Sequence, residues 1–340
     1  MEAPDVYIFV CGSSRSGTTM MSRVLGNHSK VFGFQELHFF DELLPSMDVV
    51  HPISTEKAVH LLSTLKSIQR DGYFGPRDWR KYVDESQHQL SGKSSHSIEL
   101  LLEFLKSESE RNGKCIPCEQ TPQSVFAMDT ILQHVPNARF VVMVRDPREV
   151  LLSQKGKWKR RKLSGGKIPW MESFRSRINY HPALISRIWK ATYEAALRHE
   201  HDSRVLMLRY EDLTDHPEAA VIKICQHIGL TYEPAMLDVP RVGSSNVSDG
   251  IGGRGIDKTL KGKWQSGLND GEVAICEKIN GQQMMRFGYV SSSIKGSWSL
   301  TFLYTLILPI QITLAVFLNL RRLRHFKKHL TKFFSRGTDR

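Results

Sequence analysis

The sequence predicts an α/β protein in which helices flank a parallel β-sheet, followed by a C-terminal transmembrane helix. Three patterns support this prediction. Short apolar runs alternate with segments of helical periodicity, as in proteins whose parallel strands are joined by covering helices. A glycine-rich turn, CGSSRSGTTMM at 11–21, follows the first apolar run. At the other end of the chain, no charged residue occurs between 296 and 320.

The elements follow in chain order from these periods. The expected strands are the β-rich apolar runs at 6–10, 31–34, 139–144 and 204–208. The expected helices lie at 16–27, 54–69, 97–110, 122–134 and 183–200. One more helix is expected to open with Asp146 as N-cap, Pro147 at N1 and Glu149 at N3. The Gly- and Ser-rich segment 243–255 is expected to be a loop, and no linker divides residues 1–290, which we expect to form one domain.

The charge is unevenly distributed along the 340 residues. The net charge is +12, and residues 321–340 hold eight Lys or Arg against one Asp. The rest of the chain is therefore only mildly basic, which suits an anionic ligand and does not call for nucleic acid. Five scattered cysteines give no disulfide framework; Cys115 and Cys118 are better explained as inert thiols or a local disulfide than as zinc ligands. No metal-ligand cluster is apparent.

The uncharged segment 297–320 is long enough to cross a membrane. As a helix from Trp298 it would measure about 35 Å, at about 1.5 Å per residue, against a hydrocarbon layer of about 30 Å. Pro309 and Gln311 are tolerated in such helices, and the alternative is a long buried helix. By the positive-inside rule, the basic tail 321–340 is expected in the cytosol and the domain on the far side of the membrane. No secretory segment precedes the first strand, however, so the side of the domain stays open.

The glycine-rich turn predicts an anion site. Between a buried strand and a helix, such a turn directs backbone N–H groups and the positive helix end at an anion. Gly12 and Gly17 have the spacing of the phosphate loop G-x-x-x-x-G-K-[ST], but Thr18 replaces its lysine. Arg15 brings charge into the loop, and Thr18 and Thr19 bring hydroxyl donors. We expect a phosphate-like ligand bound without the lysine and magnesium of nucleoside triphosphate chemistry.

Two motifs resemble those of sulfotransferases that use 3′-phosphoadenosine 5′-phosphosulfate (PAPS). R-S-G-T-T after a strand resembles their 5′-phosphosulfate loop, and PNARFVVMVRDPREVLLSQ at 136–154 resembles their 3′-phosphate motif. The resemblance implies that Arg145 and Ser153 hold the 3′-phosphate; the alternative for Arg145 is an ion pair with Asp146 or a surface contact. It also implies a set of loop residues around the 5′ end of the donor: Ser14, Arg15, Ser16, Gly17, Thr18 and Thr19.

The nearest branch by motif is that of tyrosylprotein and related Golgi or bacterial carbohydrate-type sulfotransferases. In these a glutamate shortly after the first helix is the catalytic base, which implies this role for Glu36 in GFQELHFF. Glu36 follows an expected strand, at the sheet edge where α/β folds bind ligands, and a carboxylate there can accept a proton. A glutamate that only faces water is the alternative, and His38 is the second candidate base.

Other matches are weaker and partly depart from the family pattern. CEQTP at 118–122 resembles a segment that commonly reads E-K-T-P, so Gln120 replaces a lysine that stabilises the transferring group. Either Arg15 suffices, or Lys258 or Lys263 replaces that charge, or activity is impaired. The resemblance also implies that Tyr210 lies near the adenine or 3′-phosphate and that Lys263, in KGKW, closes over the nucleotide.

The sequence therefore predicts a PAPS-dependent sulfotransferase with a hydroxyl acceptor: a carbohydrate, a protein tyrosine, or a lipid or small alcohol. The basic stretch 155–167 suits an acidic acceptor or an anionic bilayer, or is simply a solvated loop. We expect a single-pass membrane protein, of the Golgi or endomembranes if eukaryotic. The alternatives are a P-loop kinase-like phosphotransferase and a non-catalytic, membrane-tethered nucleotide-binding protein.

Overall fold

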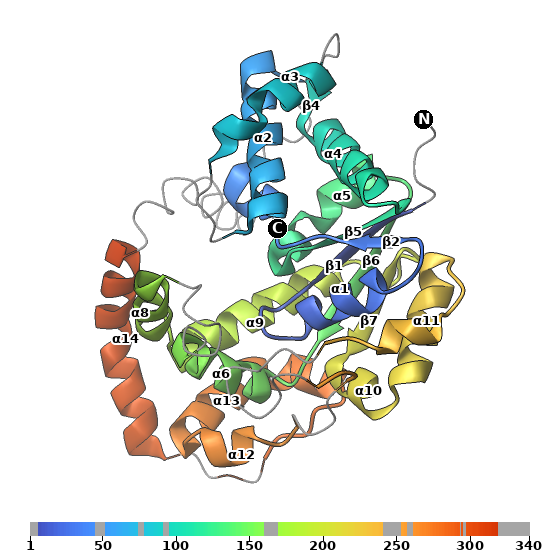
Figure 1. The fold of residues 1–340 in the computed structure, drawn as a ribbon. Coiled ribbons are helices and arrows are strands. Elements are labelled where there is room, and N and C mark those ends of the chain that lie inside the picture. The colour runs from blue at the N-terminus through green and yellow to red at the C-terminus, as the bar shows by residue number, and fades with distance from the viewer. Residues whose placement is uncertain are drawn as a thin grey trace, which may run out of the picture.

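A five-stranded parallel sheet forms the centre of the protein (Figure 1). The computed structural model describes residues 6–44, 52–73, 78–90, 95–159, 169–240, 253–256, 261–292, 294 and 297–318. The strand order is β2-β5-β1-β6-β7, and every neighbouring pair is parallel. This confirms the predicted parallel sheet. The strands are β1 (Tyr7–Gly12), β2 (Val31–Gly33), β5 (Ile116–Gln120), β6 (Ala138–Val144) and β7 (Val205–Arg209).

Strand β5 was absent from the sequence prediction, and its position matters for the site. Its sequence, IPCEQ, is short and contains a proline and two polar residues, so its period does not mark it as a strand. It pairs with β1 through Ile8 and Cys118, and Tyr7 and Ala138 pair β1 with β6. The end of β5 is thereby fixed beside the glycine-rich turn that follows β1.

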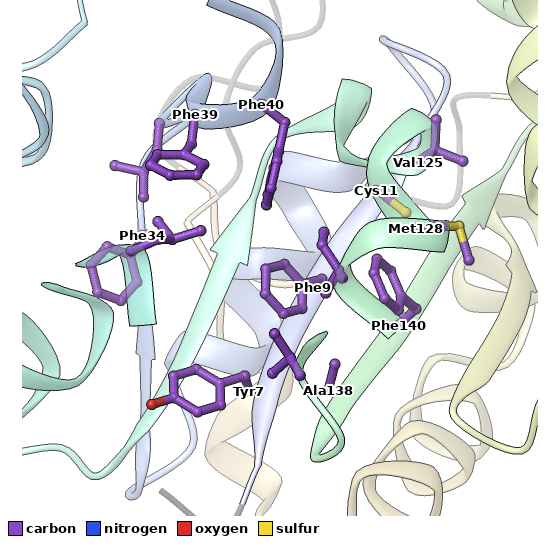
Figure 2. Close-up of a cluster of buried hydrophobic side chains, with 14 of the residues drawn as sticks. Tyr7, Phe9, Cys11, Phe34, Phe39, Phe40, Val125, Met128, Ala138 and Phe140 are labelled. Atoms are coloured by element: carbon purple, nitrogen blue, oxygen red, sulfur yellow. The ribbon is translucent and has the colours of Figure 1, made fainter. Parts of the chain in front are cut away.

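Helices cover both faces of the sheet, because alternate residues of the central strand point to opposite sides. Tyr7, Phe9 and Cys11 face one buried cluster, in which Phe9 and Phe140 stack with their ring centroids 5.3 Å apart (Figure 2). This cluster lies against α2 (Thr55–Asp71), α4 (Ser97–Arg111), α5 (Met128–His134) and α9 (Pro182–Leu197). Ile8 and Val10 face a second cluster against α1 (Thr18–Gly26) and α11 (Pro217–Ile228).

The remaining elements extend these two layers. Two short strands, β3 (Pro52–Ile53) and β4 (Ser95–His96), form a separate antiparallel pair. The other helices are α3 (Val83–Leu90), α6 (Pro147–Lys155), α8 (Trp170–Ile178), α10 (Tyr210–Asp215), α12 (Trp264–Gly267), α13 (Asp270–Arg286) and α14 (Trp298–Leu318). The helical turns are η1 (Phe39–Leu43), η2 (Trp79–Tyr82), η3 (Pro122–Ala127), η4 (Lys157–Lys159) and η5 (Pro234–Leu237).

Most predicted helices are confirmed, with local corrections at their ends. The Asp146 carboxylate accepts a hydrogen bond from the Arg148 amide at 2.9 Å, so Asp146 caps α6 as predicted. The first helix begins at Thr18, two residues later than predicted, because Gly17 has a left-handed backbone (φ 94°). The segment predicted as one helix at 122–134 begins as the turn η3 and continues as α5. The predicted loop 243–255 falls mostly outside the described residues.

Helix α14 is the apolar C-terminal helix predicted from the sequence. Residues Ser299–Leu318 have a mean hydropathy of 2.0, and the helix passes beside α8 and α13 (Figure 1). The basic segment 321–340 lies outside the described residues. The division into a domain at 1–290, a span at 297–320 and a tail therefore stays a prediction.

We expect the substitution Gly12→Ala to destabilise the fold more than Gly113→Ala. Both glycines have a positive φ (139° and 70°), but a Cβ at Gly12 would lie 2.4 Å from the Met143 carbonyl oxygen, whereas nothing lies within 4 Å at Gly113. Overpacking of this kind costs about 1–3 kcal/mol, and it adds to a backbone strain that is itself larger at a φ of 139° than at a φ of 70°. Denaturant unfolding measures the difference, and equal losses in the two variants would contradict the close approach of the β1 and β6 backbones.

Candidate functional site

Polar side chains gather at the carboxyl edge of the sheet, where parallel α/β folds bind ligands. The loop after β1 lies there, flanked by the ends of β5, β6 and β7. Gln120 ends β5, Arg145 directly follows β6, and Tyr210 directly follows β7. Three residues from distant parts of the chain thus surround the loop that the sequence singles out.

The loop backbone is held from below by a buried tyrosine. The Tyr193 hydroxyl of α9 donates to the Met143 carbonyl at 2.8 Å, so its oxygen accepts from the Ser16 hydroxyl at 3.1 Å and from the Ser13 amide at 3.5 Å. The Ser16 side chain therefore supports the loop. Within it Arg15 has a left-handed backbone (φ 78°), a conformation that costs a residue other than glycine about 1 kcal/mol or more.

The other loop residues differ in exposure. Ser14 is half-buried, Thr18 is buried and Thr19 is exposed at the start of α1. The Tyr210 ring lies against Gly17 so closely that a Cβ there would come within 2.6 Å of it. Gly17 is thus required both for its positive φ and for the contact with Tyr210. The loop is closed on one side by this ring and leads into the positive end of α1.

The structure brings the two predicted phosphate motifs into direct contact. Arg15 Nε donates to Ser153 Oγ at 2.9 Å, and Arg145 Nη1 donates to the Arg15 carbonyl at 3.1 Å. The Arg145 guanidinium also lies 4.4 Å from the centre of the Tyr210 ring, a cation–π arrangement. Four residues predicted to bind one ligand therefore form one connected cluster of donors.

The alternative role of Arg145, an ion pair with Asp146, is not what the structure shows. Asp146 pairs with Arg148, Nη2 to Oδ2 at 2.7 Å, whereas the carboxylate beside Arg145 is that of Glu149 at 3.7 Å. Glu149 Oε1 also accepts from the Trp264 amide at 3.3 Å. This contact brings the preceding residue, Lys263, to the Arg145 side of the site. Lys258 lies outside the described residues.

Glu36 is connected to the loop through Gln120. Gln120 Nε2 lies 3.3 Å from Glu36 Oε1 and 3.4 Å from Thr18 Oγ1, and donates to both. The Glu36 side chain keeps 40% of its surface exposed, so its carboxylate is accessible to a second molecule. Glu36 therefore belongs to the same site as the loop, although 18 residues separate it from Thr18 in the chain.

His38 is held as a cation between two carboxylates. Its Nδ1 lies 2.9 Å from Asp41 Oδ2, and its Nε2 lies 3.4 Å from Glu36 Oε2. Burial lowers the pKa of His38, but the hydrogen bonds to Asp41 and Glu36 outweigh it and raise that pKa to about 10. Partial removal of water from Glu36 raises its pKa. The hydrogen bonds from His38 and Gln120 and the charges of His38 and Lys157 lower it by more, so the pKa of Glu36 lies below its usual value. Glu36 is ionised at neutral pH.

A second acid, Glu119, lies under the site and faces no solvent. It is 2% exposed and accepts hydrogen bonds from the hydroxyls of Thr121 and, at 3.2 Å, Ser124. Burial raises its pKa from 4.5 to about 7. The Thr121 hydroxyl also accepts from the His38 amide at 3.3 Å, so Glu119 supports the segment that carries Glu36.

Sequence reasoning missed four residues of this arrangement: Tyr193, Asp41, Glu119 and Lys157. No motif surrounds Tyr193, and the sequence indicates only that it is an apolar position of a helix. The D-E at 41–42 and the acid at 119 carry no spacing that marks a site. Lys157 was noticed only as one charge in the basic stretch 155–167. Only its position four residues beyond Ser153, in the turn η4 that follows α6, could have pointed to the site.

All five cysteines are free thiols, so Cys115 and Cys118 form no disulfide. Among the residues that the structure describes, no three His, Cys, Asp or Glu side chains gather as a metal site requires.

We expect Glu119→Gln to stabilise the protein at pH 8 and not at pH 5. A carboxyl whose pKa is raised in the folded state destabilises the fold when it is ionised. This destabilisation is absent below about pH 4.5, where the carboxyl is protonated in both states, and complete above about pH 7. The shift of its pKa corresponds to at most about 3 kcal/mol. Thermal unfolding at both pH values measures the change, with the exposed Glu56→Gln as control. A variant that is less stable than wild type at pH 8 would contradict the raised pKa.

Comparison with known proteins agrees with this site. A family model described as the sulfotransferase family matches residues 7–234. An uncharacterized protein of Aquifex aeolicus (strain VF5) is 24% identical over 240 residues, which are 68% of this chain and 26% of that protein. The chain thus matches about a quarter of the length of that relative.

Solved structures were also compared with the fold of this chain. A sulfotransferase domain from the curacin biosynthetic pathway superposes with a TM-score of 0.51 at 17% identity, over 86% of this chain and 99% of that domain. The sulfotransferase domain of the Synechococcus PCC 7002 olefin synthase gives 0.48 at 18% identity, over 82% and 95%. The first of these shares the fold. Because the family match covers more than half of the 340 residues and contains both phosphate motifs, this chain belongs to the sulfotransferase family.

Proposed function

We propose that the protein transfers a sulfuryl group from PAPS to a hydroxyl acceptor, with Glu36 as general base. One observation supports this above all: Gln120 joins Glu36 to Thr18 on one side of the loop, while Arg15 joins the loop to Ser153 on the other. A base and two groups of phosphate-binding donors thus surround a single glycine-rich loop. Family membership supports sulfuryl transfer as the reaction class.

The residues present fit a donor that carries phosphate groups at both ends of an adenosine. The loop amides, Arg15, Thr18 and Thr19 would bind the 5′-phosphosulfate, as helix N-termini with nearby arginines do. Arg145 and Ser153 would bind the 3′-phosphate. The hydrogen bond between Arg15 and Ser153 supports this assignment, because it joins the two groups of donors that would bind one donor molecule.

Two further residues would complete the donor site. In this proposal the Tyr210 ring lies beside the adenosine, and Lys263 closes over it from α12. The contact of the Trp264 amide with Glu149, which is next to Arg145, supports the placement of Lys263.

The reaction follows from the position of Glu36. The acceptor oxygen attacks sulfur, a new O–S bond forms, and the S–O bond to the 5′-phosphate breaks as that phosphate leaves. The acceptor proton passes to the Glu36 carboxylate. Arg15 and the loop amides stabilise the charge that develops on the leaving phosphate.

His38 is less suited to act as the base. Both of its ring nitrogens face carboxylates, and its raised pKa keeps it protonated at neutral pH. A protonated imidazole has no lone pair that could accept the acceptor proton. In this proposal His38 orients Glu36 and keeps it ionised.

Lys157 supplies the positive charge that Gln120 lacks. Gln120 has the place of the family lysine but donates only a neutral hydrogen bond. Lys157 lies four residues beyond Ser153, whose hydroxyl contacts Arg15, and its charge acts on Glu36. A lysine in this place would stabilise the transferring sulfuryl group. This residue replaces Lys258 and Lys263, the cations considered from the sequence.

The site and the charge distribution also suggest a class of acceptor and a cellular location. An accessible carboxylate suits a tyrosine, a sugar or a lipid hydroxyl, and the basic stretch 155–167 favours an acidic or membrane-borne one. We propose attachment to a bilayer through residues 297–320, in a Golgi-like membrane if the source is eukaryotic. A non-catalytic nucleotide-binding role stays a second candidate because Gln120 replaces the family lysine.

We expect Glu36→Gln to lower kcat about 10²- to 10⁴-fold, the usual contribution of a general base, and to leave donor affinity nearly unchanged. Sulfate transfer from labelled PAPS to peptide tyrosine, sugar and lipid acceptors measures turnover, and titration calorimetry with the desulfated nucleotide measures binding. Arg145→Gln is the matched control, because it should lose nucleotide affinity instead. Full turnover by Glu36→Gln would exclude Glu36 as base, and nucleotide binding without turnover of any acceptor by the wild type would favour the inert protein.

Lys157→Gln should lower kcat roughly tenfold to a hundredfold, somewhat below the range for loss of a donor to a developing charge. Lys159→Gln, two residues away in the same turn and exposed, should change kcat less than twofold. The comparison cancels any general effect of the basic stretch on an acidic acceptor. Equal losses in the two variants would assign Lys157 to steering and leave Arg15 as the cation of the site.

A further inference from the structure

Helix α14 contacts the domain along one side. Its less exposed side chains recur every three or four residues, at 301, 304, 308, 311, 315 and 318. This spacing defines one stripe of a helix, which we call the docking seam. The seam packs against α13 and α8.

The two largest polar side chains that the structure describes on α14 both lie in the docking seam. Gln311 Nε2 donates to the backbone carbonyls of Ile178, at 2.9 Å, and of Tyr180. The Tyr304 hydroxyl accepts from Asn269 Nδ2 at 3.0 Å. These two side chains therefore lie on the face that contacts the domain, whereas Thr305 and Thr313 are exposed and bond to the helix's own backbone.

A buried histidine adds a contact to the backbone of α14. His181 Nδ1 accepts from the Ala183 amide at 3.2 Å, so its Nε2 carries the proton and donates to the Tyr304 carbonyl at 3.1 Å. His181 itself is 1% exposed. These contacts would be lost if α14 left the domain, and buried polar groups would lose their partners.

A membrane crossing conflicts with this docking. If α14 crossed a bilayer in its docked position, α13 would enter the hydrocarbon with it. Helix α13 carries Asp270, Glu272, Glu277 and Lys278, and each charge in hydrocarbon costs about 3 kcal/mol or more. The length of α14 does not distinguish a helix across the bilayer from one along its surface, because its 21 residues measure about 30 Å in both cases.

The face of α14 opposite the seam is apolar and exposed, and α8 continues it. We call the exposed residues on these two helices the apolar face: Trp170, Phe174, Phe302, Leu306, Ile310 and Phe317, which are 48–71% exposed. The two helices lie next to one another (Figure 1). An apolar surface of this extent on a soluble protein marks an interaction site.

Basic segments adjoin both helices. Residues 155–167, just before α8, hold seven Lys or Arg and no acid, and residues 321–340, just after α14, have a net charge of +7. An apolar helix face with basic flanks and an exposed tryptophan is typical of proteins that lie in the headgroup region of anionic membranes. Charge complementarity therefore selects an anionic bilayer as the occupant of the apolar face.

We propose that α14 and α8 lie flat in the surface of an anionic bilayer, with the docking seam intact and the domain and the C-terminal segment on the same side. This replaces the single crossing predicted from the sequence. It rests on the membrane attachment proposed above and is independent of sulfuryl transfer.

Topology in sealed vesicles tests the orientation. The full chain with an epitope tag after Arg340 is added to vesicles of phosphatidylcholine with one-fifth phosphatidylserine, and external protease is applied. The domain and the tag should be digested together, and alkaline carbonate should release the protein. A tag that is protected while the domain is digested would overturn the flat orientation, and no binding to the vesicles would overturn membrane attachment altogether.

Paired substitutions test the apolar face. Leu306→Ser/Ile310→Ser should weaken binding to these vesicles roughly tenfold or more, because both exposed side chains would enter the headgroup region. Phe126→Ser/Ile188→Ser is the matched control, since it removes two exposed apolar side chains elsewhere and should change binding less than twofold. Equal loss in both variants, or equal binding to vesicles without phosphatidylserine, would overturn the proposal. Circular dichroism of each variant verifies that it is folded.

Discussion

The site depends on the hydrogen bond from Arg145 to the carbonyl of Arg15. This bond holds the loop with Arg15 in a left-handed conformation, which the isolated chain disfavours. The Tyr193 hydroxyl holds the same loop from below, and the Tyr210 ring closes it at Gly17. Arg145 after β6, Tyr210 after β7 and Tyr193 of α9 thus fix one turn, so its amides are ordered before any ligand arrives. Such preorganisation reduces the cost of ordering on binding.

The charges around Glu36 serve opposite needs in the proposed reaction. A strong base needs a high pKa, whereas a base that must be ionised at neutral pH needs a low one. His38 and Lys157 favour the ionised form and outweigh the crowded surroundings. Glu119 shows the opposite result, because burial raises its pKa more than the hydroxyls of Thr121 and Ser124 and the charge of His38 lower it. The two acids differ in depth, since the Glu36 side chain is 40% exposed and Glu119 is 2% exposed, and also in their neighbours. In our proposal these differences separate the base from a supporting carboxylate.

Helix α14 shows that composition and packing can lead to different conclusions about one segment. An uncharged run of this length satisfies every requirement for a membrane span. Gln311 and Tyr304, however, have hydrogen-bond partners at the end of α8 and the starts of α9 and α13, and those partners belong to a charged domain. The same helix therefore provides an apolar surface outward and a specific docking surface inward. In our proposal the bilayer contacts only the outward surface.

Much of the fold and the phosphate-binding part of the site could be predicted from the sequence. The turn at 11–21 and the motif at 136–154 are local, since glycine spacing, a capping aspartate and a strand period depend on near neighbours. Strand β5 could not be predicted, because IPCEQ becomes a strand only between β1 and β2. Gln120 and Lys157 could not be predicted as partners of Glu36, because only the tertiary structure brings residues 18, 36, 120 and 157 to one edge of the sheet. What the sequence alone determined is which residues can bind phosphate; what the tertiary structure decided is which charges act together, because electrostatic and hydrogen-bonding effects depend on distance in space.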